Sequence, residues 1–433
     1  MRGKILFISS VTLLFLTTIP HPAYADASAQ LKEAGMLVKN RQYEQAEAIY
    51  QQIVTAFPDT NEALEAQKQL TCVYIATDRQ QEADAAFEKL ITGFSKNKNI
   101  SEAVWLIAKR YNTSKKYEKA IEINQYNVEH FPKDIHAMWS QMNIIRYYIS
   151  NGNEPAADAA FNKLITIFSQ QPTLPEEVWR LAKMYSGLKR DDKAFEFYQY
   201  NVEHFPKDIH AMWSQMDIIR AHISNGNEPA ADAAFNKLLT VFSQQPTLPE
   251  EVWRLAKMYS GLKRDDKSFE LHQYNTEHFS KDIHAMWSQM DIIRAYISDG
   301  NEPAADAAFN KLLTVFSQQP TLPEEVWRIA KMYSGLKRDD RAFELYQYNV
   351  GHSPKDIHAM WSQMNIIRAY ITDGNEPAAD AAFDKLLAVF SDQPTLPNEV
   401  YRIADLYGQT GRYNKANGLY KKALQLYQYV IDK

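Results

Sequence analysis

The stretch LPEEVWRLAKMYSGLKRDDKAFEFYQYNVEHFP, residues 174–206, holds two helical patterns separated by a turn. Small and apolar side chains at Val178, Leu181, Ala182 and Tyr185 follow the i, i+3, i+4, i+7 spacing of one helix face. A proline and two glutamates precede this stripe, which suits a first helical turn because proline lacks an N–H and carboxylates favour the positive end of the helix dipole. A second stripe follows the Lys-Arg-Asp-Asp turn and stops before Phe-Pro. The stretch therefore predicts a pair of helices.

This helix pair recurs along the chain with a period of 37 residues. A small residue begins the second apolar stripe of every unit, and successive copies of it are always 37 residues apart. These residues are Ala46, Ala83, Ala120, Ala157, Ala194, Ala231, Ser268, Ala305, Ala342, Ala379 and Ala416. Eleven units of this length begin near residues 27, 64, 101, 138, 175, 212, 249, 286, 323, 360 and 397. Two kinds of unit alternate, so the decapeptide KDIHAMWSQM returns every 74 residues, from Lys133, Lys207, Lys281 and Lys355. A short helix pair buries its apolar face poorly alone, so we expect the pairs to stack.

The pattern resembles the tetratricopeptide repeat family. Its signature of aromatic-x₂-Leu-Gly-x₂-Tyr, Ala-x₃-Phe and a closing Pro is matched by Val178-x₂-Leu181-Ala182-x₂-Tyr185, Ala194-x₃-Tyr198 and Pro206. The resemblance implies an all-α fold, a right-handed superhelical α-solenoid of about eleven helix pairs spanning residues 26–433, in which the first helices line a concave groove. The unit is 37 residues long rather than 34, and serine replaces the closing proline in alternate units. The family's carboxylate clamp, which is built from Lys and Asn on successive first helices, is not reproduced in this sequence. The resemblance therefore does not imply that this chain binds the tails of chaperones.

All eight tryptophans belong to the repeat and lie outside the core stripe, on the first helix of each pair. In one unit type Lys183 lines up with Trp179 at helical spacing, and in the other Met216 and Arg220 line up with Trp213. Large aromatic side chains and guanidinium groups dominate binding hot spots, and cations pair with aromatic rings. We therefore expect a partner-binding groove made of Trp105, Trp139, Met142, Arg146, Trp179, Lys183, Trp213, Met216, Arg220, Trp253, Lys257, Trp287, Met290, Arg294, Trp327, Lys331, Trp361, Met364 and Arg368. The alternative is that each tryptophan packs between neighbouring first helices and the cations cover it.

The histidines and carboxylates do not form a recognised site for metals or catalysis. His204 and His210 flank a loop, but His-x₅-His across a proline turn is not a metal-ligand spacing and no second cluster completes a tetrahedron. Asp208 is better explained as the N-cap of the following helix. The sequence has no phosphate loop, zinc-protease motif or nucleophile elbow. We expect no enzyme activity, no cofactor and no metal, and the single cysteine, Cys72, to be either a buried small residue or a free thiol on the groove.

Residues 1–25 have the pattern of a signal peptide. A positively charged start precedes an apolar run from Ile5 to Leu16, and Ala23-Tyr24-Ala25 offers a cleavage site. The run is too short to span a membrane comfortably, and no later segment approaches the roughly 20 apolar residues that a span needs. We therefore expect a protein exported to the periplasm or outside the cell. The net charge of −5, with acids and bases interleaved, does not suggest a nucleic-acid partner.

These patterns lead to one function hypothesis and two alternatives. The first is a non-enzymatic scaffold that captures an extended protein or peptide segment, with repeated weak contacts adding up along the groove. The second is a structural spacer that self-associates through its terminal units, which are the least repeat-like. The third is saccharide binding on the aromatic ladder.

Overall fold

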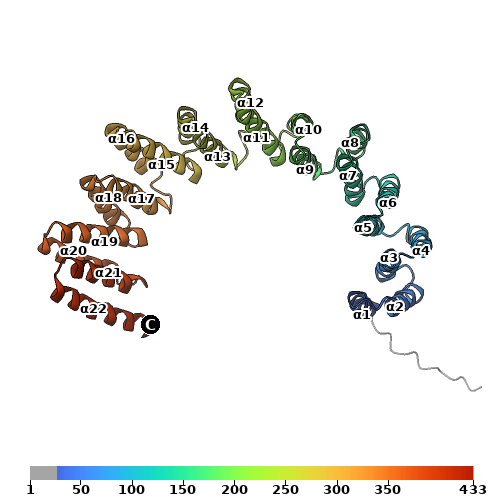
Figure 1. Ribbon diagram of the computed structural model, residues 1–433, viewed down its shortest axis with the longest axis horizontal. Coiled ribbons are helices and arrows are strands. Elements are labelled where there is room, and N and C mark those ends of the chain that lie inside the picture. The colour runs from blue at the N-terminus through green and yellow to red at the C-terminus, as the bar shows by residue number, and fades with distance from the viewer. Residues whose placement is uncertain (1–26, 433) are drawn as a thin grey trace, which may run out of the picture. The chain divides into compact units, whose positions relative to one another are not determined.

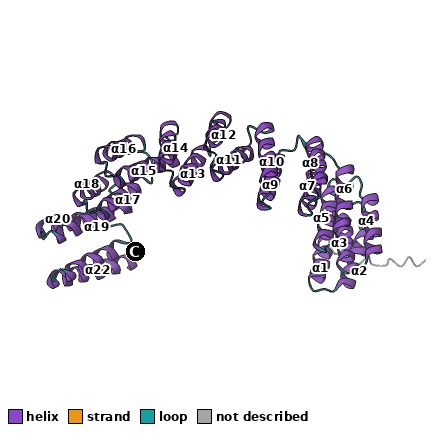
Figure 2. Ribbon diagram, turned by 45° about the horizontal axis from the view of Figure 1, so that its top comes forward, coloured by secondary structure: helices purple, strands orange, loops and turns teal. Residues whose placement is uncertain are grey.

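The computed structural model describes residues 27–432, and within this range every regular element is an α-helix (Figure 2). The predicted signal peptide lies outside these residues. The all-α solenoid is confirmed, since one helix pair follows another along the chain and, within each of two compact units, each pair packs against the next. The handedness of the superhelix stays a prediction. None of the described helices is long and apolar enough to cross a membrane.

Contacts divide the described chain into two compact units, with the boundary between Val241 and Phe242. The sequence predicted one uninterrupted array, because the spacing of the repeat does not change at this point. The first unit contains α1 (Ala27–Lys39), α2 (Tyr43–Ala56), α3 (Asn61–Ala76), α4 (Gln80–Gly93), α5 (Ile100–Thr113), α6 (Tyr117–His130), α7 (Ile135–Ser150), α8 (Glu154–Phe168), α9 (Leu174–Gly187), α10 (Asp191–His204), α11 (Ile209–Ser224) and α12 (Glu228–Val241).

The second unit contains the remaining five helix pairs. They are α13 (Leu248–Gly261), α14 (Asp265–His278), α15 (Ile283–Ser298), α16 (Glu302–Val315), α17 (Leu322–Gly335), α18 (Asp339–His352), α19 (Ile357–Thr372), α20 (Glu376–Val389), α21 (Leu396–Gln409) and α22 (Tyr413–Asp432). Within each unit the odd-numbered first helices contact one another along one side, and the even-numbered second helices lie on the other (Figure 1). The tryptophans of the first helices therefore share a side.

The turn inside each helix pair requires one residue in the left-handed region of backbone conformation. Gly226 meets this requirement in the Asn-Gly-Asn turn with a φ of +70°, a conformation that glycine adopts without steric cost. The alternate unit type uses a lysine instead, as at Lys189, where φ is +59°. Both kinds of turn end the first helix where the sequence predicted a break.

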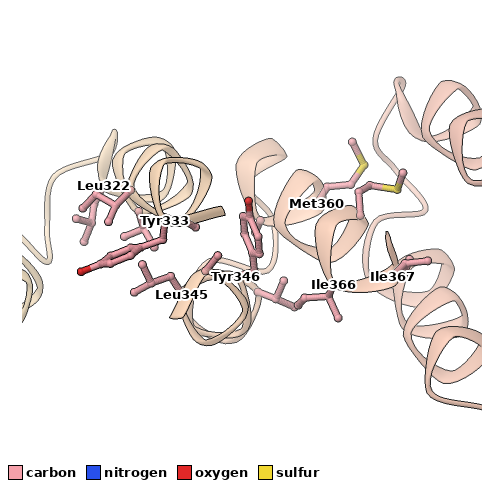
Figure 3. Packing of buried hydrophobic residues seen from close by; sticks show 14 of the residues in the cluster. Leu322, Tyr333, Leu345, Tyr346, Met360, Ile366 and Ile367 are labelled. Carbon is pink, nitrogen blue, oxygen red and sulfur yellow. The ribbon is translucent and has the colours of Figure 1, made fainter. Parts of the chain in front are cut away.

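The core of the second unit is formed by the stripes that the repeat predicts. Figure 3 shows Tyr346 of α18 between Tyr333 and Leu345 on one side and Ile366 and Ile367 of α19 on the other. All five side chains are buried, and fully burying one such side chain stabilises the fold by roughly 1.5–3 kcal/mol. The side chains of consecutive helix pairs thus form one continuous core.

Two buried amides tie neighbouring helices together in each 74-residue module. The Asn201 Nδ2 of α10 donates to the Pro175 carbonyl of α9 at 3.0 Å and to the Ser214 Oγ of α11 at 3.0 Å. Gln215 occupies the family's aromatic core position, and its Nε2 donates to the Ala234 carbonyl of α12 at 2.7 Å. The same bonds recur for Asn127, Asn275, Asn349, Gln141, Gln289 and Gln363. These hydrogen bonds pair the buried amide N–H groups and fix the stacking of the helix pairs, whereas the Asn201 Oδ1 and Gln215 Oε1 atoms are buried without a partner in the described residues.

Candidate functional site

The eight tryptophans form four pairs, each joining two consecutive first helices. The ring centroids of Trp179 on α9 and Trp213 on α11 are 5.5 Å apart. The other pairs are separated by 5.2 Å for Trp105 and Trp139, 5.4 Å for Trp253 and Trp287, and 5.3 Å for Trp327 and Trp361. These are contact distances for aromatic rings, so the packing of each tryptophan against a neighbouring first helix, which the sequence left as an alternative, is present.

The tryptophans are nevertheless only half-buried, so each pair keeps part of its surface exposed. A histidine completes each pair: the His210 ring lies 4.9 Å from the ring of Trp213 and 6.0 Å from that of Trp179. Asp208 holds this histidine, because its Oδ1 accepts the His210 backbone N–H at 2.8 Å and lies 3.0 Å from His210 Nδ1. The predicted N-cap role of Asp208 is confirmed. His210 is thus part of the aromatic cluster and does not stand alone at an edge.

The two histidines that flank the loop have separate environments. His204 stacks on Tyr200 with ring centroids 3.9 Å apart, and its Nδ1 lies 2.9 Å from the Tyr200 carbonyl. His210 instead contacts the tryptophans. Within residues 27–432 no group of three or more His, Cys, Asp or Glu side chains is arranged to hold a metal ion.

Asp217 is the polar centre of the Trp179 site. Its Oδ2 accepts the indole N–H of Trp179 at 3.1 Å, and it also hydrogen-bonds the buried hydroxyl of Tyr198. Arg220 donates to its Oδ1 at 3.2 Å, and the Lys183 ammonium lies 3.6 Å from the same atom. Burial, together with the charge of Asp217, raises the pKa of Tyr198 far above its ordinary value, so this hydroxyl keeps its proton.

The next module repeats this arrangement with a histidine in place of the tyrosine. Asp291 accepts the Trp253 indole N–H at 3.2 Å and an Arg294 N–H at 2.9 Å, and it lies 3.6 Å from Lys257. His272 Nε2 lies 3.6 Å from Asp291, and burial lowers the pKa of His272 to about 4. The sequence analysis did not single out these two aspartates, although their position directly before the paired isoleucines is visible in the repeat.

The cations of the predicted groove are largely paired with acids. Arg146 donates to the buried carboxylate of Glu177 at 2.8 Å, and Arg294 lies 3.7 Å from Glu325. Burial raises the pKa of Glu325 against the opposing effect of nearby arginines. The lysines of the other unit type remain about half exposed; the ammonium groups of Lys183 and Lys331 each lie 5.9 Å from a tryptophan ring centroid. The lysines are therefore somewhat more exposed than the arginines of this surface.

The four methionines of the predicted groove do not face solvent. Met142 and Met216 are fully buried, Met290 is 1% exposed and Met364 is 7% exposed. Each first helix packs against its own second helix and also against neighbouring first helices, so its buried face is wider than the single stripe used in the prediction. The methionines fall within this wider face. Their predicted role in contacting a partner is wrong.

Cys72 on α3 is half-buried, and burial raises the pKa of its thiol to about 11. At neutral pH this group is therefore a protonated thiol rather than a reactive thiolate.

Comparisons with known proteins complete the description. Two family models described as tetratricopeptide repeat match residues 28–60 and 400–429. The chain contains tetratricopeptide repeats. The matches fall on the first and last helix pairs, which lack the paired tryptophans of the modules between them. The sequence has no match among curated proteins.

Solved structures of other proteins align with long stretches of this tetratricopeptide-repeat chain at low identity. The C-terminal part of a TPR repeat-containing protein from Cytophaga hutchinsonii is 17% identical with a TM-score of 0.31, covering 68% of this chain and 98% of that one. Yeast Tom70 is 12% identical with a TM-score of 0.30 and covers 94% of each chain. Pseudomonas aeruginosa PilF is 14% identical with a TM-score of 0.29, covering 51% of this chain and 93% of that one.

Tetratricopeptide repeats are in general non-enzymatic scaffolds for protein interactions. The repeats of this chain support a scaffold of that general kind, with protein partners.

Proposed function

We propose that the first helices bind an extended segment of a partner protein along the half-exposed tryptophan pairs. The observation that carries this proposal is the fourfold recurrence of a half-exposed tryptophan pair, which in three of the four copies has a lysine close to one ring, as at Trp179, Trp213 and Lys183. Recurring sites along one chain add their affinities through effective concentration. A partner with acidic and apolar side chains spaced along an extended chain suits this surface.

The test replaces the lysines of this surface and leaves the structural rings in place. Lys183, Lys257 and Lys331 are changed together to Glu, and the matched control changes Lys189, Lys263 and Lys337, in the exposed turns of the same helix pairs, to Glu. Partners are crosslinked in the native cell and quantified by mass spectrometry. We expect the first triple variant to lose at least tenfold of its crosslinked partner while the control keeps it. Equal recovery by both variants would show that this surface is not the binding site.

We further propose that the protein acts after export, in the periplasm or outside the cell. The support is the pattern of residues 1–25, a positively charged start, an apolar run and a small-residue cleavage site. N-terminal sequencing of the mature chain is expected to begin near residue 26. A mature chain that begins at Met1 in the cytoplasm would contradict this proposal.

Self-association through the last helix pair is a second candidate, favoured by the exposure of apolar side chains on α22. Leu424 is 67% exposed and Tyr429 is 51% exposed, although a helix at the end of a repeat array normally presents a polar outer face. Sedimentation of the Leu424→Glu variant tests this candidate. We expect a concentration-dependent dimer of the unmodified chain to be absent from the variant, and a chain that is monomeric at all concentrations would reject it.

A further inference from the structure

A cavity of about 620 Å³ lies between α5, α6 and α7 of the first unit. Its volume falls in the range of roughly 300–1,000 Å³ that is typical of small-molecule sites. Its wall includes the indole of Trp105, four asparagines and two tyrosine rings, so it is not a purely apolar packing defect.

The cavity occupies a place that the other modules fill with a ring. Asn124, on α6, stands where the later modules have Tyr198, His272 and Tyr346. All four side chains are buried, Asn124 being 3% exposed, so the position always points into the interior. The carboxamide of Asn124 is much smaller than the phenol or imidazole ring that occupies the equivalent position in the later modules. The space that the ring would take is left open in this module alone among the four.

Two buried polar groups of the cavity wall lack hydrogen-bond partners. Within the described residues, the Trp105 indole N–H and the Asn124 carbonyl oxygen are buried without a hydrogen bond. In the following module the equivalent indole N–H is satisfied by Asp217, whereas the first module has Asn143 at that position. A buried polar group without a partner costs about 1–3 kcal/mol, and such groups are rare in proteins. Two of them facing one cavity indicate a site that a ligand completes.

The charge of the lining points to an anion. Lys109 and Arg146 line the cavity and no carboxylate does. The Lys109 ammonium lies 5.4 Å from the Trp105 ring centroid, while Arg146 shares its charge with Glu177 outside the lining. The site therefore has an excess of positive charge that a ligand carboxylate would balance.

The other residues that line the cavity suit a ligand with hydroxyl groups on a ring. Each carboxamide of Asn112, Asn124 and Asn143 can donate and accept a hydrogen bond, as a hydroxyl group does. The rings of Tyr117 and Tyr147, whose centroids are 6.3 Å apart, line the same cavity and offer apolar surfaces for ring carbons. We propose that this cavity binds a small hydroxylated organic anion of the sugar-acid class. The cavity shares Trp105 and Lys109 with the first module's part of the proposed partner-binding surface, but ligand binding in the cavity does not require a bound partner segment.

Titration of the full mature chain with glucuronate, followed by calorimetry, tests the proposal. The informative variant is Asn124→Tyr, which restores the residue of two later modules and should therefore fold. The matched control is Gln125→Tyr, the next residue of α6, which is exposed and does not line the cavity. We expect the unmodified chain and Gln125→Tyr to bind glucuronate equally, and Asn124→Tyr to bind it at least tenfold more weakly.

A second variant and two further probes test the chemical class. Asn143→Asp introduces the carboxylate of the middle modules, which satisfies Trp105 but repels an anion, so it should also weaken glucuronate binding at least tenfold. Neutral glucose and hydroxyl-free acetate should each bind more weakly than glucuronate. The proposal is overturned if glucuronate fails to bind at millimolar concentrations, if Asn124→Tyr binds it unchanged, or if glucose or acetate binds as tightly.

Discussion

The Trp179 site and the Trp327 site have the same fold but satisfy their polar atoms differently. Asp217 accepts hydrogen bonds from both Trp179 and Tyr198 in the first. In the second, Asn365 stands at the position of this aspartate and accepts neither. The Trp327 indole N–H and the Tyr346 hydroxyl are buried there without a partner in the described chain.

The geometry of the rings is nearly unaffected by this difference. The paired tryptophans are 5.5 Å apart beside the aspartate and 5.3 Å apart beside the asparagine. Apolar packing of the first helices is thus sufficient to form the pair, and the acceptor contributes local stability. The two sites should therefore differ in the cost of polar substitutions more than in their structure.

The largest expected effect is that of Asp217→Ala. Trp179, Tyr198 and Arg220 all lose an acceptor, and we expect local stability to fall by roughly 3–4 kcal/mol, since each buried donor left unpaired costs about 1–3 kcal/mol. The control is Asn365→Ala, which loses only the bond from Asn365 Nδ2 to the Trp361 carbonyl and should cost less than about 1 kcal/mol. Hydrogen exchange of α11 and α19, followed by mass spectrometry, measures both. Equal costs would remove the distinction between the sites.

The module with a histidine at the tyrosine position should lose stability as the pH falls. Burial is the main cause that lowers the pKa of His272 from 6.5 to about 4, with Lys257 adding to the effect and Asp291 opposing it. The unfolded chain takes up this proton near pH 6.5 and the folded chain only near pH 4, so stability is complete above pH 6.5 and is lost as the pH falls between these values. The expected loss is at most about 3 kcal/mol.

The control for this prediction is His272→Tyr, which restores the residue of the neighbouring modules. Urea unfolding midpoints of the two chains should diverge as the pH falls from 6.5 toward 4 and should differ by a constant amount above 6.5. Parallel midpoints over the whole range would show that His272 does not titrate in this way.

Asn365→Asp should convert the second site into the first. The new carboxylate gives Trp327 and Tyr346 an acceptor, with Arg368 and Lys331 nearby to balance its charge, and we expect a gain of about 1 kcal/mol. Hydrogen exchange of α17 and α19 should slow. Faster exchange would mean that desolvating the carboxylate outweighs its hydrogen bonds.

The smallest expected effect is a difference between two matched ring substitutions. Trp179→Phe removes the N–H that Asp217 accepts, whereas Trp327→Phe removes an N–H that has no partner. Both lose similar apolar area, so the first should cost more by about 0.5–1 kcal/mol. Thermal unfolding of the two variants measures this difference, and the opposite order would contradict the hydrogen-bond account.

The sequence was sufficient to predict the helix pairs because spacing alone determines them. The stripe from Val178 to Tyr185, the break after Gly187 and the cap at Asp208 all depend on residues close in the chain. The division between Val241 and Phe242 could not be predicted in this way, since the repeat continues through it unchanged.

The candidate site was predicted in part. The helical spacing placed the tryptophans outside the core stripe of their own helix pair. The contact between two tryptophan rings depends on how neighbouring first helices stack, and the sequence of a single helix does not reveal this stacking. Met216 was assigned to the surface for the same reason. The open cavity did leave a signal, because Asn124 departs from the aromatic residue of later modules, and comparing the copies position by position would have shown it.

The amide bridges described for Asn201 have a consequence for how the chain reaches its native state. Asn127, Asn275 and Asn349 make the same pair of bonds to nearly the same sequences, so a second helix that docks one module too early or too late would keep them. Near-identical neighbours are a known source of misassembly in repeat proteins. The positions where the copies differ, such as Asn124 and His272, are then the places where correct and shifted docking differ in energy.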